Sequence, residues 1–352
     1  MNPLEQQLAH PFGDAIPAAA ETLDVAPGIR WIRMPLPFAL DHVNLYLLRD
    51  RFGGRDGWTL VDCGAATDAT RALWQRAAAQ SLDGLPIVRV LCTHMHPDHI
   101  GMADTLTDRF EAPLWMTPGE YAMARVLSAA GGRPEVDRTV AHFRRHGVDD
   151  PAVLGAATAH HFPSLVPSVP PAYVRLRADE PVVIGERRWQ VIIGTGHSPE
   201  HASLYCADGP GGPLLLSGDM VLPRISTNVS VFDLEPEANP VEWFLDSLRE
   251  YAPCDADTLV LPSHGRPFSR LHVRVRQLTD HHAERLEVLQ AALRDRPLSA
   301  FEAVPVVFGR RFDTHQMIFA LGEALAHLHA LMYRGSARRH ADADNVLRFS
   351  AG

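Results

Sequence analysis

The stretch Thr93-His94-Met95-His96-Pro97-Asp98-His99-Ile100-Gly101 places four side chains that can bind a metal within six residues. It directly follows the apolar run Ile87–Leu91, and a bounded run of this length is typical of a buried strand. Such a strand would deliver its first two histidines on one side at its end, and Asp98 and His99 where the chain turns away. Imidazole nitrogen suits zinc, and carboxylate oxygen suits zinc, iron or manganese, so the stretch predicts a metal site.

Four further apolar runs each lead into a short turn that carries another potential ligand. These runs are Thr59–Val61, Val191–Ile193, Leu214–Leu216 and Leu259–Leu261, and the turns after them carry Asp62, His197, Asp219 and His264, respectively. Each turn contains small residues or glycine, and glycine lets the backbone turn tightly and approach a bound ion closely. The pattern predicts that several strand ends meet around one centre.

The order of these motifs resembles the metallo-β-lactamase superfamily over roughly residues 28 to 270, with every ligand position filled. By that resemblance, a first metal ion would be held by His94, His96 and His197. A second would be held by Asp98, His99 and His264, and Asp219 would bridge the two. Asp62 resembles the family's carboxylate that orients a ligating histidine rather than binding metal. The resemblance therefore implies two metal ions per chain, with zinc favoured and iron or manganese as alternatives.

The expected fold class is α/β, with the αββα sandwich of the metallo-β-lactamase family and a small C-terminal helical domain. We expect an N-terminal lead-in over residues 1–27 and a catalytic domain over residues 28–270. Residues 271–352 show three helical stretches and then two short strand-like runs, which resemble a winged helix. The apolar stripe Ile318, Leu321, Leu325, Leu328 and Met332 on the last helix must be buried against something.

Residues 118–178 depart from strand–helix alternation and end in a Pro-rich segment, so we expect a lid or insertion that builds a wall of the substrate pocket. His160 and His161 in this segment are interpreted as lid or surface residues, because the seven ligand positions are already filled elsewhere.

The composition limits the chemistry and the partners. All 33 basic residues are arginine, which excludes a Schiff-base lysine and a phosphate-loop lysine. The net charge is −9 and no dense basic stripe occurs, which disfavours nucleic acid. Residues 276–352 carry ten arginines against nine acids, so this segment is expected to serve packing or a homodimer rather than DNA binding. Four isolated cysteines, no signal peptide and no long apolar segment predict a cytoplasmic protein with no membrane association. The bias towards arginine and alanine suggests a GC-rich bacterial gene.

The expected activity is hydrolysis by a hydroxide that bridges the two metal ions, with Asp98 able to receive its proton. The favoured substrate is a small molecule or acyl group joined by a carboxylic ester, thioester or lactone bond, because the insertion is apolar and the chain is acidic. One alternative is a phosphodiesterase or ribonuclease of the same superfamily. A non-enzymatic alternative is a metal-bound regulator that uses its winged helix, which would retain DNA in a strongly salt-dependent way.

Overall fold

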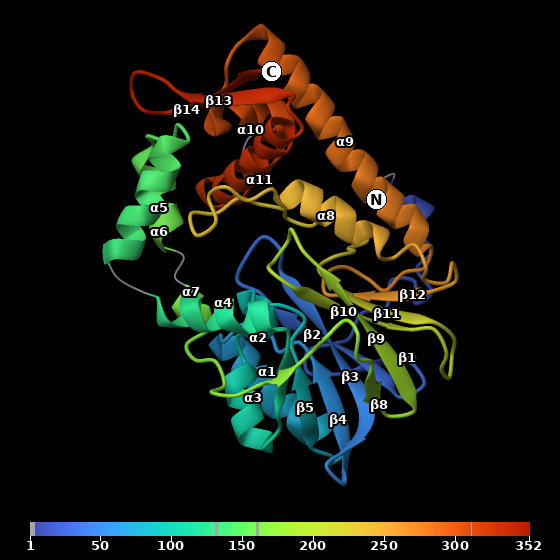
Figure 1. The fold of residues 1–352 in the computed structure, drawn as a ribbon. Helices are drawn as coiled ribbons and strands as arrows, with labels where there is room; N and C mark the ends of the chain where they lie inside the picture. Colours follow the sequence, from blue (N-terminus) through green and yellow to red (C-terminus); the bar gives the residue numbers. More distant parts are fainter. Residues whose placement is uncertain (1–3, 131–132, 160–161, 311) are drawn as a thin grey trace.

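The structure, a computed structural model, describes residues 4–130, 133–159, 162–310 and 312–352. Two β-sheets pack face to face, and helices cover both outer faces (Figure 1). The strands of the first sheet, in spatial order, are β1 (Leu23–Ala26), β2 (Ile29–Pro35), β3 (His42–Phe52), β4 (Arg55–Val61), β5 (Ile87–Leu91), β6 (Leu114–Met116) and β7 (Val174–Arg175). Those of the second sheet are β12 (Leu259–Pro262), β11 (Leu214–Gly218), β10 (His201–Cys206), β9 (Arg187–Gly194) and β8 (Val182–Ile184).

The helices fall into three groups by position in the fold. The first sheet is accompanied by α1 (Asp68–Gln80), α2 (Pro97–Ile100), α3 (Ala103–Phe110), α4 (Pro118–Ala129) and α7 (Phe162–Leu165). The insertion also contains α5 (Arg133–Arg145) and α6 (Pro151–Ala159). The second sheet is covered by α8 (Pro240–Arg249), and the C-terminal region contains α9 (Leu271–Asp295), α10 (Ala300–Phe308) and α11 (Thr314–Tyr333), followed by the hairpin β13 (Ala337–Ala341) and β14 (Leu347–Ala351).

Strand β3 shows how the sequence builds the layers. Leu45 and Leu47 pack in the core between the first sheet and its helices. Tyr46 and Leu48 lie in the core between the two sheets. Successive strand residues point to opposite faces, and a sheet covered on both faces needs apolar residues at every position. The predicted αββα sandwich is therefore confirmed, and β5 spans the same five residues that the apolar run predicted.

The first sheet begins before residue 28, because β1 lies within the predicted lead-in and pairs antiparallel with β2. The turn between β3 and β4 consists of Gly53 and Gly54, both with positive φ. Two such residues in a two-residue loop match the twist of the flanking strands, which favours glycine at both positions.

The C-terminal helices share one apolar core with the second sheet. Leu215 of β11, Phe244 of α8, Leu289 of α9 and Leu325 of α11 all belong to it and are at most 1% exposed. The predicted apolar stripe on α11 is therefore buried against the chain's own helices and sandwich, so it gives no argument for a second subunit. The winged-helix description of this region stays a prediction.

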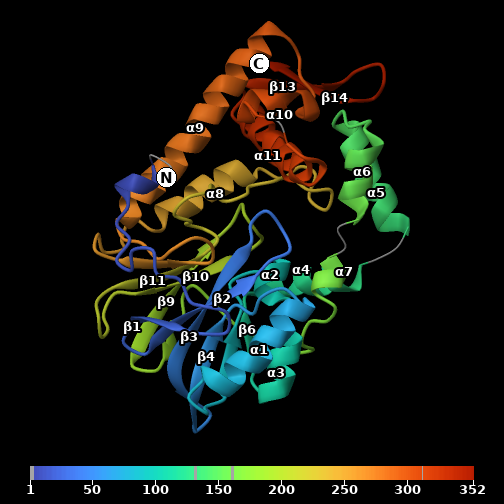
Figure 2. The same cartoon turned by 180° about the vertical axis from the view of Figure 1, so that it is seen from behind.

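The insertion, residues 118–178, extends from the first sheet to the C-terminal helices. Helices α4 and α7 lie near the first sheet, whereas α5 and α6 lie beside α11 (Figures 1 and 2). Phe143 and Leu154 join the C-terminal core, and the Phe301 N–H donates to the His146 carbonyl at 3.1 Å. His160 and His161 lie outside the described residues. No helix among the described residues is both long and apolar enough to cross a lipid bilayer.

Candidate metal centre

Five strand ends meet at one place and carry the predicted side chains there. Residues that directly follow β4, β5, β9, β11 and β12 supply Asp62, His94, His197, Asp219 and His264. The β5 strand leads through His96 into the short helix α2, which contributes Asp98 and His99. All seven predicted ligands belong to three overlapping groups whose ligand atoms lie within 4.8 Å of one another in each group.

The first group is a triangle of imidazole nitrogens. His94 Nε2 lies 2.9 Å from His96 Nδ1 and 3.2 Å from His197 Nε2, and the last two atoms are 3.1 Å apart. The other ring nitrogen of His197 contacts the Asn228 carbonyl at 2.7 Å, which can only accept a hydrogen bond. His197 Nδ1 therefore carries the proton, and its Nε2 lone pair points into the triangle.

The second group contains two histidines and two carboxylates. Asp98 Oδ2 lies 3.4 Å from both His99 Nε2 and His264 Nε2. Asp219 Oδ1 lies 3.3 Å from His264 Nε2 and 3.6 Å from His99 Nε2. Its other oxygen, Oδ2, lies 3.4 Å from His197 Nε2 in the first group. The two oxygens of Asp219 thus face the two groups separately.

Contacts at Nδ1, on the side away from the carboxylates, orient the two histidine rings of the second group. His99 Nδ1 contacts Asp62 Oδ2 at 2.8 Å, and His264 Nδ1 contacts the His42 carbonyl at 2.8 Å. Both partners accept, so both Nδ1 atoms donate and both Nε2 atoms face the carboxylates of the group. Asp62 also accepts hydrogen bonds from the Thr93 backbone N–H and hydroxyl. The structure thus places Asp62 behind His99, on the side of the ring away from the Asp98 and Asp219 carboxylates.

The donor set fits a cation. His99 Nε2 and Asp219 Oδ1 are buried and have no hydrogen-bond partner, although such atoms are rarely left unpaired. Burial and the neighbouring His197 lower the pKa of His96 to about 3, so this ring presents a lone pair at neutral pH. Burial opposes a charge on His264, but the Asp219 and Asp98 carboxylates outweigh it and raise the pKa of His264 to about 10. Positive charge is therefore favoured beside the carboxylates, and a metal ion would meet that demand in place of protons.

One side of the centre faces solvent. His94 and His99 are fully buried, whereas His96 and Asp98 are half-buried. The α2 side of the centre is therefore its more exposed side.

Sequence reasoning missed two buried residues that hold the ligands. His201 Nε2 accepts a hydrogen bond from the Asp219 backbone N–H at 3.1 Å. A Cβ at Gly218, where φ is +52°, would lie 2.2 Å from the same nitrogen, so only glycine allows this close approach. Glu120 at the start of α4 accepts hydrogen bonds from Met95 and Ser198, which are next to ligands. The motif Thr117-Pro118-Gly119-Glu120 was a visible helix-start signal, but it did not reveal a contact with the centre.

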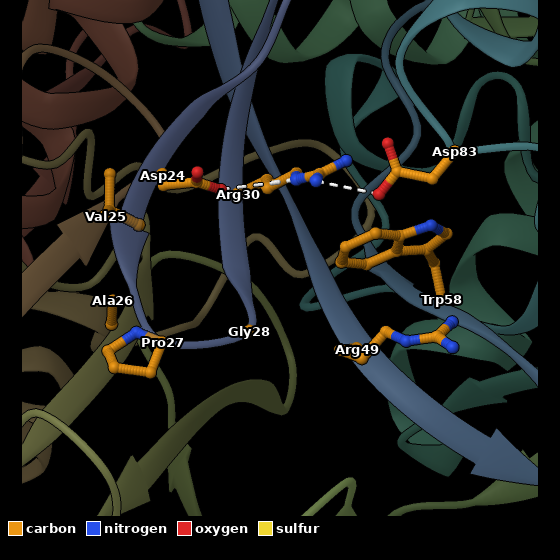
Figure 3. A pocket seen from close by; sticks show the side chains of 9 residues that line it. All are labelled: Asp24, Val25, Ala26, Pro27, Gly28, Arg30, Arg49, Trp58 and Asp83. Carbon is orange, nitrogen blue, oxygen red and sulfur yellow. Dashed lines mark hydrogen bonds and ion pairs between the residues drawn. The ribbon is translucent and has the colours of Figure 1, made fainter.

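A cavity of about 570 Å³ lies away from the centre, between β1, β2 and β3 (Figure 3). Its Arg30 guanidinium is held by Asp24 and Asp83 at 3.2 and 2.8 Å and lies 4.7 Å from the Trp58 ring centroid. None of the seven predicted ligands lines it. The cavity is larger than a single water site, but its charges are largely paired and it has no link to the ligand cluster.

The chain belongs to the metallo-beta-lactamase superfamily, whose family model matches residues 39–264. A second model, the metallo-beta-lactamase-like C-terminal domain, matches residues 286–352. The fold and the converging ligand groups at strand ends agree with this assignment.

Three similar proteins illustrate the range of the family. A beta-lactamase domain protein from Burkholderia ambifaria is 51% identical, covers all of both chains and superposes with a TM-score of 0.93. A probable metallo-hydrolase, YqjP of Bacillus subtilis, is 25% identical over 85% of this chain and 91% of its own length. Ribonuclease Z of Mycobacterium avium is 29% identical over 46% of this chain and 52% of its own length.

Proposed function

We propose that this metallo-hydrolase of the superfamily binds two metal ions, zinc by preference, and hydrolyses a carboxylic ester, thioester or lactone of a small or acyl substrate. The observation that carries the proposal is the division of seven donors into two groups joined by Asp219. Seven ligands exceed the four of one tetrahedral zinc site, and the set of five imidazoles and two carboxylates suits zinc, iron or manganese.

The proposed ligands of the first ion are His94, His96 and His197, and those of the second are Asp98, His99 and His264, with Asp219 shared. When bound, such ions supply Lewis acidity and lower the pKa of a coordinated water towards neutrality. Asp62, the Asn228 carbonyl and the His42 carbonyl fix the ring orientations in advance. This order of the side chains reduces the reorganisation needed for binding and reaction.

Asp98 is the proposed proton acceptor. Its contacts with His99 and His264 run through Oδ2, whereas Asp219 uses both oxygens within the cluster. The Asp98 side chain is also 17% exposed, so it can be reached by water. The carboxylate can therefore hold a proton released by an attacking water while Asp219 stays engaged with both groups.

A phosphodiesterase or ribonuclease activity is the second candidate, and the likeness to ribonuclease Z favours it. The charges of the C-terminal region weigh against a long polynucleotide. Ion pairs to carboxylates engage Arg285, Arg296, Arg334, Arg339 and Arg348. Paired arginines release fewer counterions on contact with nucleic acid, and non-specific affinity scales with that number. The same pairing weighs against a DNA-binding regulator.

The test is a substrate panel on zinc-loaded protein, with a short-chain nitrophenyl ester, an acyl thioester, a lactone and bis(4-nitrophenyl) phosphate. We expect turnover of at least one acyl substrate to exceed turnover of the phosphodiester, and an Asp219→Ala variant to lack it. Faster phosphodiester cleavage would favour the nuclease candidate. No turnover of any substrate, together with salt-sensitive DNA retention, would favour the regulator.

A further inference from the structure

Glu120 occupies an unusual position for a residue in a helix-start motif. Thr117-Pro118-Gly119-Glu120 has the spacing of a capping box, in which the glutamate returns to the backbone N–H of the first residue. In the structure Thr117 makes no such cap. Instead, the Glu200 carboxylate, from the turn before β10, accepts a hydrogen bond from the Gly119 N–H at 2.6 Å. The cap of α4 is thus supplied by another segment, which leaves the Glu120 carboxylate for a different partner.

That partner is the pair of loops that carry the first ligand group. Glu120 Oε2 accepts from the Met95 N–H at 2.9 Å, and Met95 lies between His94 and His96. Glu120 Oε1 accepts hydrogen bonds from the Ser198 hydroxyl at 2.6 Å and from the Glu200 N–H at 2.7 Å. Both residues lie in the loop that follows His197. The Glu120 residue is 0% exposed. One buried carboxylate therefore ties together the two loops that supply the nitrogen triangle.

Burial of the Glu120 carboxylate costs free energy, which indicates that this side chain has a role beyond packing. A carboxylate without a positive partner is expensive to bury, and burial raises the pKa of Glu120 even though three donors offset part of the effect. The α10 helix offers a contrast, because there Ser299 and the partly exposed Glu302 form an ordinary reciprocal capping box. The same residue type at the same helix position thus serves its own helix in one case and the ligand loops in the other.

We propose that Glu120 is a positioning residue that sets the spacing between the His94–His96 loop and His197, and so sets the affinity of the first metal ion. This inference rests on the proposed metal-binding function. It also gives the insertion a role in the centre, because Glu120 lies in α4 and hydrogen-bonds both ligand loops.

The test compares Glu120→Gln with Glu302→Gln, the same change at the capping box of α10. In Glu120→Gln, an amide oxygen can still accept from Ser198 and Glu200, but the amide nitrogen then faces the Met95 N–H, so two donors oppose each other. Zinc dissociation constants are measured by chelator competition on metal-free protein, and thermal midpoints are measured without metal. We expect a 10- to 100-fold weaker first zinc site in Glu120→Gln, as is typical for groups behind metal ligands, and unchanged affinity in Glu302→Gln.

The possible results are distinguishable. Wild-type zinc affinity in folded Glu120→Gln, with only a lower thermal midpoint, would overturn this inference and leave the proposed function intact. Wild-type protein that binds no zinc would overturn both. If Glu120→Gln does not fold, Ser198→Ala removes one of the three hydrogen bonds, and a weakening of a few fold in zinc affinity is expected. Unchanged affinity in Ser198→Ala would then contradict the proposal.

Discussion

The molecule contains two buried histidine clusters, and they are built in opposite ways. At the candidate metal centre, imidazole nitrogens converge on one another and on two carboxylates. Between α9 and α11, His282 Nδ1 and His327 Nε2 are 3.1 Å apart, and His327 Nδ1 contacts the Glu323 carbonyl at 2.7 Å. Since the carbonyl can only accept, His327 Nε2 receives the proton of His282, and its lone pair is consumed.

The comparison shows that burial and histidine count do not define a metal site. His282 and His327 are 0% exposed, as His94 and His99 are. Among the described residues, groups of three or more convergent ligands occur at the candidate centre alone. The difference lies in the backbone, because turns at strand ends direct several side chains to one point, whereas α9 and α11 bring His282 and His327 together as a pair.

The largest effect should follow from the residue that joins the two ligand groups. Asp219→Ala should lose at least one metal ion and lower hydrolysis by about 10³-fold, which corresponds to several kcal/mol of lost charge stabilisation. Elemental analysis and turnover of the favoured acyl substrate are the measurements. A variant that keeps both metal ions and its turnover would show that Asp219 does not join two metal sites. The contrast with the His282–His327 cluster would then fail.

Asp62→Asn should have the next largest effect. The amide could present its nitrogen to His99 Nδ1, which would favour the tautomer that carries a proton on Nε2, inside the centre. We expect about 10- to 100-fold weaker binding of the second metal ion, measured by zinc titration of metal-free protein. The first site should change less, because its His197 is oriented by the Asn228 carbonyl. Equal weakening of both sites would contradict this assignment of Asp62.

The pH dependence of metal binding gives a further test of the difference between the two histidine clusters. Asp219 and Asp98 raise the pKa of His264 to about 10 despite its burial, so below that pH a metal ion must displace a proton. Apparent affinity should therefore rise with pH from 6 to 8, by about tenfold per pH unit for each proton displaced. Proton release in calorimetry with two buffers is the measurement, and binding without proton release would be inconsistent with the account.

A substitution in the His282–His327 cluster between α9 and α11 should leave metal binding unchanged. His327→Ala removes the acceptor of His282 Nδ1 and leaves a buried donor unpaired, which costs about 1–3 kcal/mol of unfolding free energy. Urea unfolding of the metal-free protein measures this cost. The number of ions bound should equal that of the wild type, and a lost ion would mean that the helical cluster is not merely structural.

Much of the fold and the clustering of the proposed ligands could be predicted because the information is local. The apolar run Ile87–Leu91 became β5 with the same bounds, and the side chains after the other runs came together as expected. The orienting contacts were not predictable in this way. Asn228 and His42 act through carbonyl oxygens that any residue would supply, and their positions depend on how distant loops pack.

The insertion and the C-terminal region were less predictable for a related reason. A Pro-rich segment indicates a loop but not its neighbour, and α5 and α6 lie beside α11 because of apolar contacts such as Leu154 in the shared core. The domain boundaries at residues 27 and 270 and the homodimer stay predictions. The apolar stripe on α11 gives no evidence for or against the homodimer, because the chain's own helices and sandwich cover this stripe.

The central claim is that two ligand groups bridged by Asp219 hold two metal ions. The most direct measurement is zinc titration of metal-free wild-type protein, followed by removal of excess metal and elemental analysis per chain. The account predicts about two ions per chain, because the seven donors exceed one tetrahedral site. One ion or none at saturating zinc would contradict it.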